Sequence, residues 1–356
     1  MLQDPFYDPT LSYEENYEEG PFAAFADGKT YEQKGEPRVG FLGQKVYLPF
    51  GIPAGPLLNS KFIKAAFEKG FDVCVYKTVR ADMFPCHPLP NILSVHFAQK
   101  DLTIKRLEEP ITADENYQDP ISITNSFGVP SRKPEVWQQD VKKAITYAKK
   151  GQVMVLSFMG TVKKDQTQEE FIEDFVLSAK LAHETGAEIL EANLSCPNIG
   201  NEGLVCYNLE VTEKITKGIR KVIQNTPLIL KIGYYQKEND LERLAKIANE
   251  YADDVAAINT LQATVVDSSG KQALPGPNRL KSGVCGFGIK WAGVETVKKL
   301  KEIKDKNNYS YSITGVGGVL NGSDYRDYKQ VGADCVMSAT GAMWNPYLAQ
   351  EIKSKL

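Results

Sequence analysis

The sequence lacks the features that would direct it to a membrane or a nucleic acid. No apolar run approaches the roughly 18 residues that a membrane-spanning helix needs. Residues 1–20 contain no lysine or arginine, which argues against a secretory signal and against a basic helix lying on a membrane. A net charge of −3 gives no electrostatic reason to bind nucleic acid.

Cysteine and histidine are also scarce. The six cysteines include no CxxC pair, so neither a zinc site nor an iron–sulfur site is expected. Without a secretory signal, the cysteines are expected to be reduced thiols in a cytoplasm. None of the three histidines lies in a segment that resembles a site, so a proton-moving reaction would need another base.

Eight short apolar runs rich in Val, Ile and Leu recur after a polar lead. Nearly continuous apolar strands of this kind are typical of a parallel sheet that is covered on both faces. The runs are PFGIPA (49–54), VCVYK (73–77), VMVLSF (153–158), EILEAN (188–193), LILKI (228–232), VAAIN (255–259), YSITG (311–315) and DCVMS (334–338).

Helical patterns, with apolar residues three and four apart, fall between these runs. They cover residues 60–70, 169–186, 208–223, 239–252 and 289–303, and a closing helix is expected at 345–356. Strands that alternate with helices or long loops predict a (β/α)8 TIM barrel of α/β class, with an open doubly wound sheet as the alternative.

The barrel is expected to occupy residues 45–356 as one catalytic domain, behind an acidic N-terminal extension at residues 1–44. Two connections, after strands two and six, are longer than a barrel needs. Long loops in compact domains are usually functional, and the loops after barrel strands form the active-site face. Both loops are therefore expected to border the site.

Polar residues stand where several predicted strands end. Lys77 ends the second strand, Asn193 the fourth and Lys231 the fifth, and Asn259–Thr260 end the sixth. A lone lysine at a strand end is most often a surface charge. Two lysines and two amides at corresponding ends of different strands would all line one barrel mouth, which favours a binding site.

Two glycine-containing segments, TGVGGV (314–319) and SATGA (338–342), follow predicted strands seven and eight. The loops after these two strands form the phosphate site of many barrels, because glycine lets the backbone approach a phosphate closely. A bound phosphate indicates a cofactor or a sugar phosphate without distinguishing between them.

The segment EANLSCPNIGNEG (191–203) places Cys196 among polar residues just beyond a buried strand. The simplest interpretation is a structural cysteine. A cysteine beside proline on a polar loop is poorly placed for a core role, however. Cys196 can act as a base if its thiolate is accessible.

These segments resemble the class 1 dihydroorotate dehydrogenases over about residues 45–345. NLSCPN (193–198) is the most specific stretch, and NSFGVP (125–130) resembles the substrate loop of that family. The other matching segments follow in the family's order and spacing: KT (77–78), HPLPN (87–91), LKI (230–232), INT (258–260), GFGIK (286–290), GVGG (315–318) and ATGA (339–342).

The resemblance implies a cytoplasmic flavoprotein of pyrimidine biosynthesis that oxidises dihydroorotate to orotate, with FMN at the barrel mouth. Cys196 would take a proton from C5 while hydride leaves C6 for flavin N5. Ser195 would belong to the same catalytic group, and Lys231 would stabilise the negative charge of the reduced flavin. A homodimer is implied, and a separate electron-transfer partner is left open.

The resemblance also assigns the binding residues. The expected substrate-binding residues are Lys77, Asn125, Phe127, Gly128, Val129, Asn193, Asn198, Asn259 and Thr260. The expected cofactor-binding residues are Ala54, Gly55, Lys77, Thr78, Asn193, Lys231, Asn259, Gly286, Gly317, Gly318, Ala339 and Thr340.

The sequence departs from the family pattern at several positions. Phe127 and Val129 replace the usual Met and Leu of the substrate loop, and Cys285 stands near a loosened Gly-Gly pair. A dihydropyrimidine dehydrogenase that acts on uracil-type rings shares INT and NLSCP and remains an alternative. A Schiff-base aldolase that uses Lys231 is a more distant one. The electron acceptor stays open, because NSxGxP resembles the fumarate-reducing type and INTL the NAD-linked type.

Overall fold

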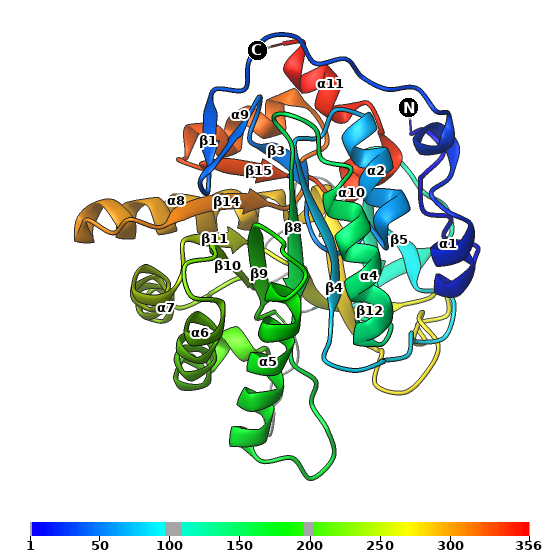
Figure 1. The fold of residues 1–356 in the computed structure, drawn as a ribbon. Helices are drawn as coiled ribbons and strands as arrows, with labels where there is room; N and C mark the ends of the chain where they lie inside the picture. Colours follow the sequence, from blue (N-terminus) through cyan, green and yellow to red (C-terminus); the bar gives the residue numbers. More distant parts are fainter. Residues whose placement is uncertain (1, 97–108, 196–202, 356) are drawn as a thin grey trace.

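The computed structural model describes residues 2–96, 109–195 and 203–355. Eight parallel strands close into a barrel in chain order (Figure 1). Each strand overlaps one of the predicted apolar runs, so the (β/α)8 prediction is confirmed and the open sheet is wrong. The strands are β3 (Phe50–Ile52), β4 (Val73–Val79), β8 (Val153–Phe158), β9 (Ile189–Asn193), β10 (Leu228–Ile232), β11 (Asp254–Ala257), β14 (Ser312–Val316) and β15 (Cys335–Met337).

Helices surround the barrel (Figure 1). They are α2 (Ser60–Glu68), α4 (Pro134–Ile145), α5 (Gln168–His183), α6 (Leu209–Ile223), α7 (Glu238–Tyr251), α8 (Lys290–Asn307), α9 (Gly322–Gln330), α10 (Thr340–Trp344) and α11 (Leu348–Lys353), with short 3-10 turns η2 (Val205–Tyr207) and η3 (Phe287–Ile289). Helix α4 was not predicted, although Trp137, Val141 and Ala144 are buried at helical spacing behind a proline in its first turn.

The inner face of the barrel follows the two-residue period of a strand. Val73 and Val75 of β4 point into the barrel interior, as does Ile229 of β10. Continuing the same alternation places Lys77 and Lys231 on the inner face, near the ends of their strands. Apolar side chains therefore fill the part of the barrel interior that is away from the mouth. Polar side chains occupy the interior where the strands approach the mouth.

The two long loops contain strands that the sequence analysis did not predict. They contribute to one five-stranded closed sheet of β5 (Ile92–His96), β6 (Ile111–Asp114), β7 (Ser122–Asn125), β12 (Leu261–Val266) and β13 (Lys281–Gly286). A sequence signal was available in β12, where Leu261, Ala263 and Val265 are buried and alternate with more exposed residues. The sheet as a whole forms by pairing between strands that are distant in the sequence.

The N-terminal extension packs onto the barrel. It contains α1 (Tyr13–Glu19), the 3-10 turn η1 (Ala23–Ala26) and a hairpin of β1 (Val39–Phe41) and β2 (Gln44–Val46). In Figure 1, α1 lies at the right edge of the molecule, and the chain then crosses to the hairpin on the left side. Phe41 and Val46 join the apolar cluster of the barrel interior, while Phe6 and Tyr13 join the cluster under the helices.

Asn16 fixes the fold of the extension. Its fully buried side chain accepts a hydrogen bond from the N–H of Asp8 at 2.8 Å. The same side chain donates to the carbonyls of Asp8, Leu11 and Ser12 at 2.9–3.2 Å. One amide therefore holds a loop and the first turn of α1 together.

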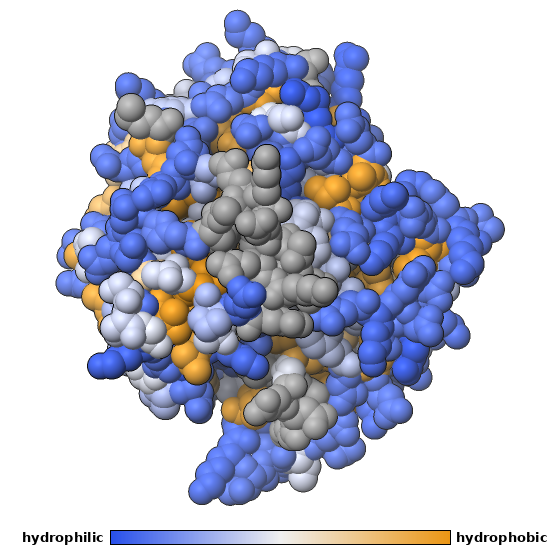
Figure 2. All heavy atoms as spheres, turned by 180° about the vertical axis from the view of Figure 1, so that it is seen from behind, coloured by the Kyte–Doolittle hydropathy of each residue, from blue (hydrophilic) through white to orange (hydrophobic). Residues whose placement is uncertain are grey.

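Within the described part of the chain, no helix is both long enough and apolar enough to cross a membrane. On the face seen in Figure 2, hydrophilic side chains predominate, and the apolar side chains form separate areas.

We expect Asn16→Ala to lower the free energy of unfolding by about 2–3 kcal/mol, because it leaves buried backbone groups of the extension without partners. Urea unfolding followed by circular dichroism measures the change. The matched control is Asn116→Ala, since Asn116 is exposed and only its backbone N–H is hydrogen-bonded to Asp114. This control should stay within about 0.5 kcal/mol of wild type. Equal stability of the two variants would contradict the role given to Asn16.

Candidate active site

A cavity of about 390 Å³ opens between the C-terminal ends of the barrel strands and the five-stranded sheet. All the predicted site residues that the structure describes line it: Ala54, Gly55, Lys77, Thr78, Asn125, Phe127, Gly128, Val129, Asn193, Ser195, Lys231, Asn259, Thr260, Gly286, Gly317, Gly318, Ala339 and Thr340. Cys196 and Asn198 lie outside the described residues. The structure thus brings the predicted set together, while the role of each residue stays a prediction.

Two buried lysines contribute positive charge to the cavity wall. Lys77 is 7% exposed and Lys231 is 3% exposed. No described residue accepts a hydrogen bond from either ammonium group or forms an ion pair with it. Burial, assisted by the nearby Arg80 guanidinium, lowers the pKa of Lys77 to about 8. A cavity with buried and unpaired cations in its wall is suited to an anionic ligand.

The loop after β7 forms another part of this wall. The buried guanidinium of Arg80 donates to the carbonyls of Val129 at 2.9 Å and Gly128 at 3.1 Å. No described residue accepts a hydrogen bond from the N–H groups of Phe127, Gly128 or Val129. Backbone N–H groups exposed at such a turn can bind an anion.

The backbone of this loop is strained in a way that fixes its shape. Gly128 and Val129 have φ angles of 76° and 53°, and a β-branched residue rarely adopts the latter. A Cβ on Gly128 would stand 2.6 Å from Nε2 of His87, so a larger residue would have to displace this ring. The surrounding contacts therefore hold the turn in one conformation.

Hydrogen bonds orient the polar side chains at the ends of β4, β8 and β9. Asn193 Nδ2 donates to Thr78 Oγ1 at 3.4 Å, and Thr78 shares a 2.9 Å hydrogen bond with Ser157. The N–H of Ser195 donates to Asn193 Oδ1 at 3.2 Å. The Ser195 hydroxyl donates to the carbonyl of Lys231 at 3.2 Å, which ties the segment after β9 to the end of β10.

The glycine-containing segments meet in one corner of the cavity and fit a phosphate group. Gly286, Gly317 and Gly318 have φ angles of 90°, 124° and 67°. A Cβ on Gly318 would lie 2.9 Å from the carbonyl oxygen of Gly286, and a Cβ on Gly341 would lie 2.3 Å from that of Val319. Only glycine lets these backbones pack so closely and face the cavity. The residues present therefore fit the phosphate of FMN.

The structure adds cavity residues that the sequence analysis missed. His87, which was assigned to no site, lines the cavity against Gly128, because the 87–91 segment folds back onto the loop after β7. Cys285 accepts hydrogen bonds at 3.4 Å from Asn125 Nδ2 and Thr340 Oγ1. Burial raises the pKa of this thiol, so it remains neutral. Tyr7 comes from the distant N-terminal extension.

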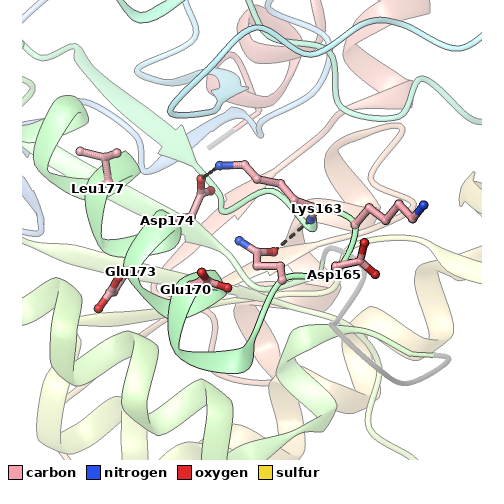
Figure 3. A pocket seen from close by; sticks show the side chains of 8 residues that line it. Lys163, Asp165, Glu170, Glu173, Asp174 and Leu177 are labelled. Carbon is pink, nitrogen blue, oxygen red and sulfur yellow. Dashed lines mark hydrogen bonds and ion pairs between the residues drawn. The ribbon is translucent and has the colours of Figure 1, made fainter.

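A second hollow, between α5 and the segment that precedes it, has a different character. Figure 3 shows Lys163 directed toward Asp174, and their ion pair measures 2.7 Å. The N–H of Lys163 also donates to Gln166 at 3.0 Å. Its charged groups include residues of both signs that pair with one another, so this hollow is an ordinary solvated surface.

Comparisons with known proteins agree with this geometry. The family model of dihydroorotate dehydrogenase matches residues 110–356. A dihydroorotate dehydrogenase of Dictyostelium discoideum is 35% identical over 98% of this chain and 97% of its own length. The catalytic subunit of dihydroorotate dehydrogenase B (NAD(+)) from Brachyspira hyodysenteriae is 27% identical over 65% of this chain and 71% of that protein.

A solved structure supports the fold. The Eimeria tenella dihydroorotate dehydrogenase, crystallised in complex with ferulenol, superposes with a TM-score of 0.68 at 17% identity, covering 93% of this chain and 87% of the other. Similarity at this level concerns the fold alone. Because the family model covers more than half of the chain and the Dictyostelium protein is similar over nearly all of it, this chain belongs to the dihydroorotate dehydrogenase family.

Proposed function

We propose that this chain oxidises dihydroorotate to orotate with FMN as its cofactor. The observation that carries the proposal is the pair of buried lysines, unpaired among the described residues, in the wall of one cavity. Dihydroorotate carries a carboxylate that an uncharged pyrimidine lacks, and FMN carries a phosphate. Membership of the family favours the same substrate and cofactor.

The residues divide between the two ligands. Gly286, Gly317 and Gly318 would hold the phosphate, and Lys231 would lie beside the flavin ring and stabilise negative charge there. Bound FMN supplies the acceptor for the hydride that leaves the substrate. Lys77 and the N–H groups of residues 127–129 would bind the substrate carboxylate.

The amide side chains would orient the pyrimidine. Asn125, Asn193 and Asn259 line the same cavity, and an amide both donates and accepts, as the ring edges require. Asn198 and Thr260 are proposed to share this role. Cys196 is proposed to remove the proton from C5, supported by the NLSCPN motif.

The remaining expectations from the sequence concern assembly, location, electron acceptor and domain division. Family membership sets the aldolase alternative aside. The homodimer, the cytoplasmic location, the electron acceptor and the division into residues 1–44 and 45–356 are proposals. The similarity to a B-type catalytic subunit is compatible with an NAD-linked partner.

The substrate is tested by mixing the purified flavoprotein anaerobically with either dihydroorotate or dihydrouracil. We expect dihydroorotate to bleach the flavin at least about tenfold more efficiently, because a charge-assisted contact to its carboxylate contributes about 1.5–3 kcal/mol. Stopped-flow absorbance measures both rates without the unknown acceptor. Faster reduction by dihydrouracil would assign the chain to the dihydropyrimidine type.

The pH dependence of ligand binding tests Lys77. Because its pKa is about 8 in the cavity, its charge is present below pH 8 and is lost as the pH rises. We expect orotate affinity, read from the flavin spectrum, to fall by up to about tenfold per pH unit above pH 8. Lys77→Met should bind weakly and lose this dependence.

The control for this prediction is Lys281→Met. Lys281 also borders the cavity, but its side chain is exposed to solvent. This variant should retain the wild-type profile. A pH profile that is unchanged in Lys77→Met would show that another group binds the carboxylate.

The proposed base is tested by Cys196→Ala, which should retain FMN and bind orotate. Its flavin should be reduced by dihydroorotate about 10²–10⁴-fold more slowly, the usual cost of losing a positioned base. Cys206→Ala is the control, because Cys206 is fully buried and burial raises its pKa to about 12. It should react at nearly the wild-type rate. Wild-type kinetics in Cys196→Ala would refute the assignment.

A further inference from the structure

The N-terminal extension forms part of the active-site wall. The N–H of Phe6 donates to the carbonyl of Met343 at 3.2 Å, which ties the extension to α10. The next residue, Tyr7, packs edge-on against Phe127 of the loop after β7, with ring centroids 5.7 Å apart. The extension thus connects the segment after β15 with the proposed substrate loop.

Tyr7 places a buried polar group beside the cavity. Its side chain lines the cavity and is 2% exposed. Its buried hydroxyl has no hydrogen-bond partner among the described residues. Burial raises the pKa of Tyr7 far above its usual value, so the phenol stays protonated and can donate a hydrogen bond.

The location of Tyr7 indicates which end of the cavity it serves. Cys86 lies close enough to perturb the pKa of both Tyr7 and Lys77. The contact with Phe127 places Tyr7 beside the loop whose N–H groups have no described acceptor. Tyr7 therefore stands on the side of the cavity where the anion-binding groups gather.

Packing alone does not explain the hydroxyl group. The ring of a phenylalanine would make the same edge-on contact with Phe127 without burying an unsatisfied donor. Buried polar groups are nearly always hydrogen-bonded, and an unpaired donor lowers stability. A ligand in the cavity would give this donor its partner.

We propose that Tyr7 is a substrate-binding residue whose hydroxyl donates a hydrogen bond to the carboxylate of bound dihydroorotate, next to Lys77. This inference rests on the proposed function. It assigns to the extension a direct part in recognising an anionic pyrimidine.

The test is Tyr7→Phe in the full-length flavoprotein, titrated with orotate while the flavin spectrum is recorded. The Kd for orotate should rise about tenfold, as expected for one lost hydrogen bond to a charged group. The flavin content should be unchanged. Without orotate, the melting temperature should not fall, because the variant removes a buried donor that has no described partner.

Tyr13→Phe is the matched control. Tyr13 belongs to the same extension and packs against the same Phe127, with ring centroids 6.2 Å apart, but it does not line the cavity. Its Kd should equal that of wild type. An unchanged Kd in Tyr7→Phe would overturn the inference alone. Failure of the wild-type protein to bind orotate would overturn the proposed function and this inference with it.

Discussion

The two-residue period of parallel strands is the constraint on which the site depends. In a closed barrel, alternate side chains of every strand must enter the interior. Val75 and Ile229 fill the lower layers, so Lys77 and Lys231, two positions further along their strands, are forced onto the same inner face. Shifting either strand by one residue would move its lysine to the helix side and away from the cavity.

Buried guanidinium groups then give the loops above the barrel a fixed shape. Arg279 is 2% exposed and donates to the carbonyls of Pro88, Pro90 and Ser126 at 2.8–3.2 Å. Arg80 donates in the same way to the carbonyls of Gly128 and Val129 in the adjoining turn. Loop carbonyls that lack a strand partner are thus satisfied inside the protein. The cavity wall is consequently organised before a ligand binds, which lowers the entropic cost of binding.

Local sequence patterns predicted the barrel because its strands are apolar runs that need no knowledge of distant residues. They also predicted the polar site residues at the barrel strand ends, since these ends converge whatever the loops do. The family resemblance supplied Asn125, Phe127, Gly128, Val129 and Gly286, which lie on or beside the five-stranded sheet. The five-stranded sheet escaped prediction because β13 pairs with β7, more than 150 residues away. Tyr7 and His87 were missed for the same reason: each comes to the cavity through contacts with segments that are distant in the sequence.

The charges inside the barrel explain why it should favour anions. Only Glu191 and Asp254 are buried acidic residues on the inner faces of the described strands. Burial raises the pKa of Asp254 to about 8, so this group is largely protonated at neutral pH and cannot balance a lysine. Asp254 therefore leaves the charge of the two buried cavity lysines, Lys77 and Lys231, without a balancing carboxylate from this strand. An anion that enters the cavity relieves the remaining cost of burying a cation, and that relief adds to ligand affinity and to the stability of the folded chain.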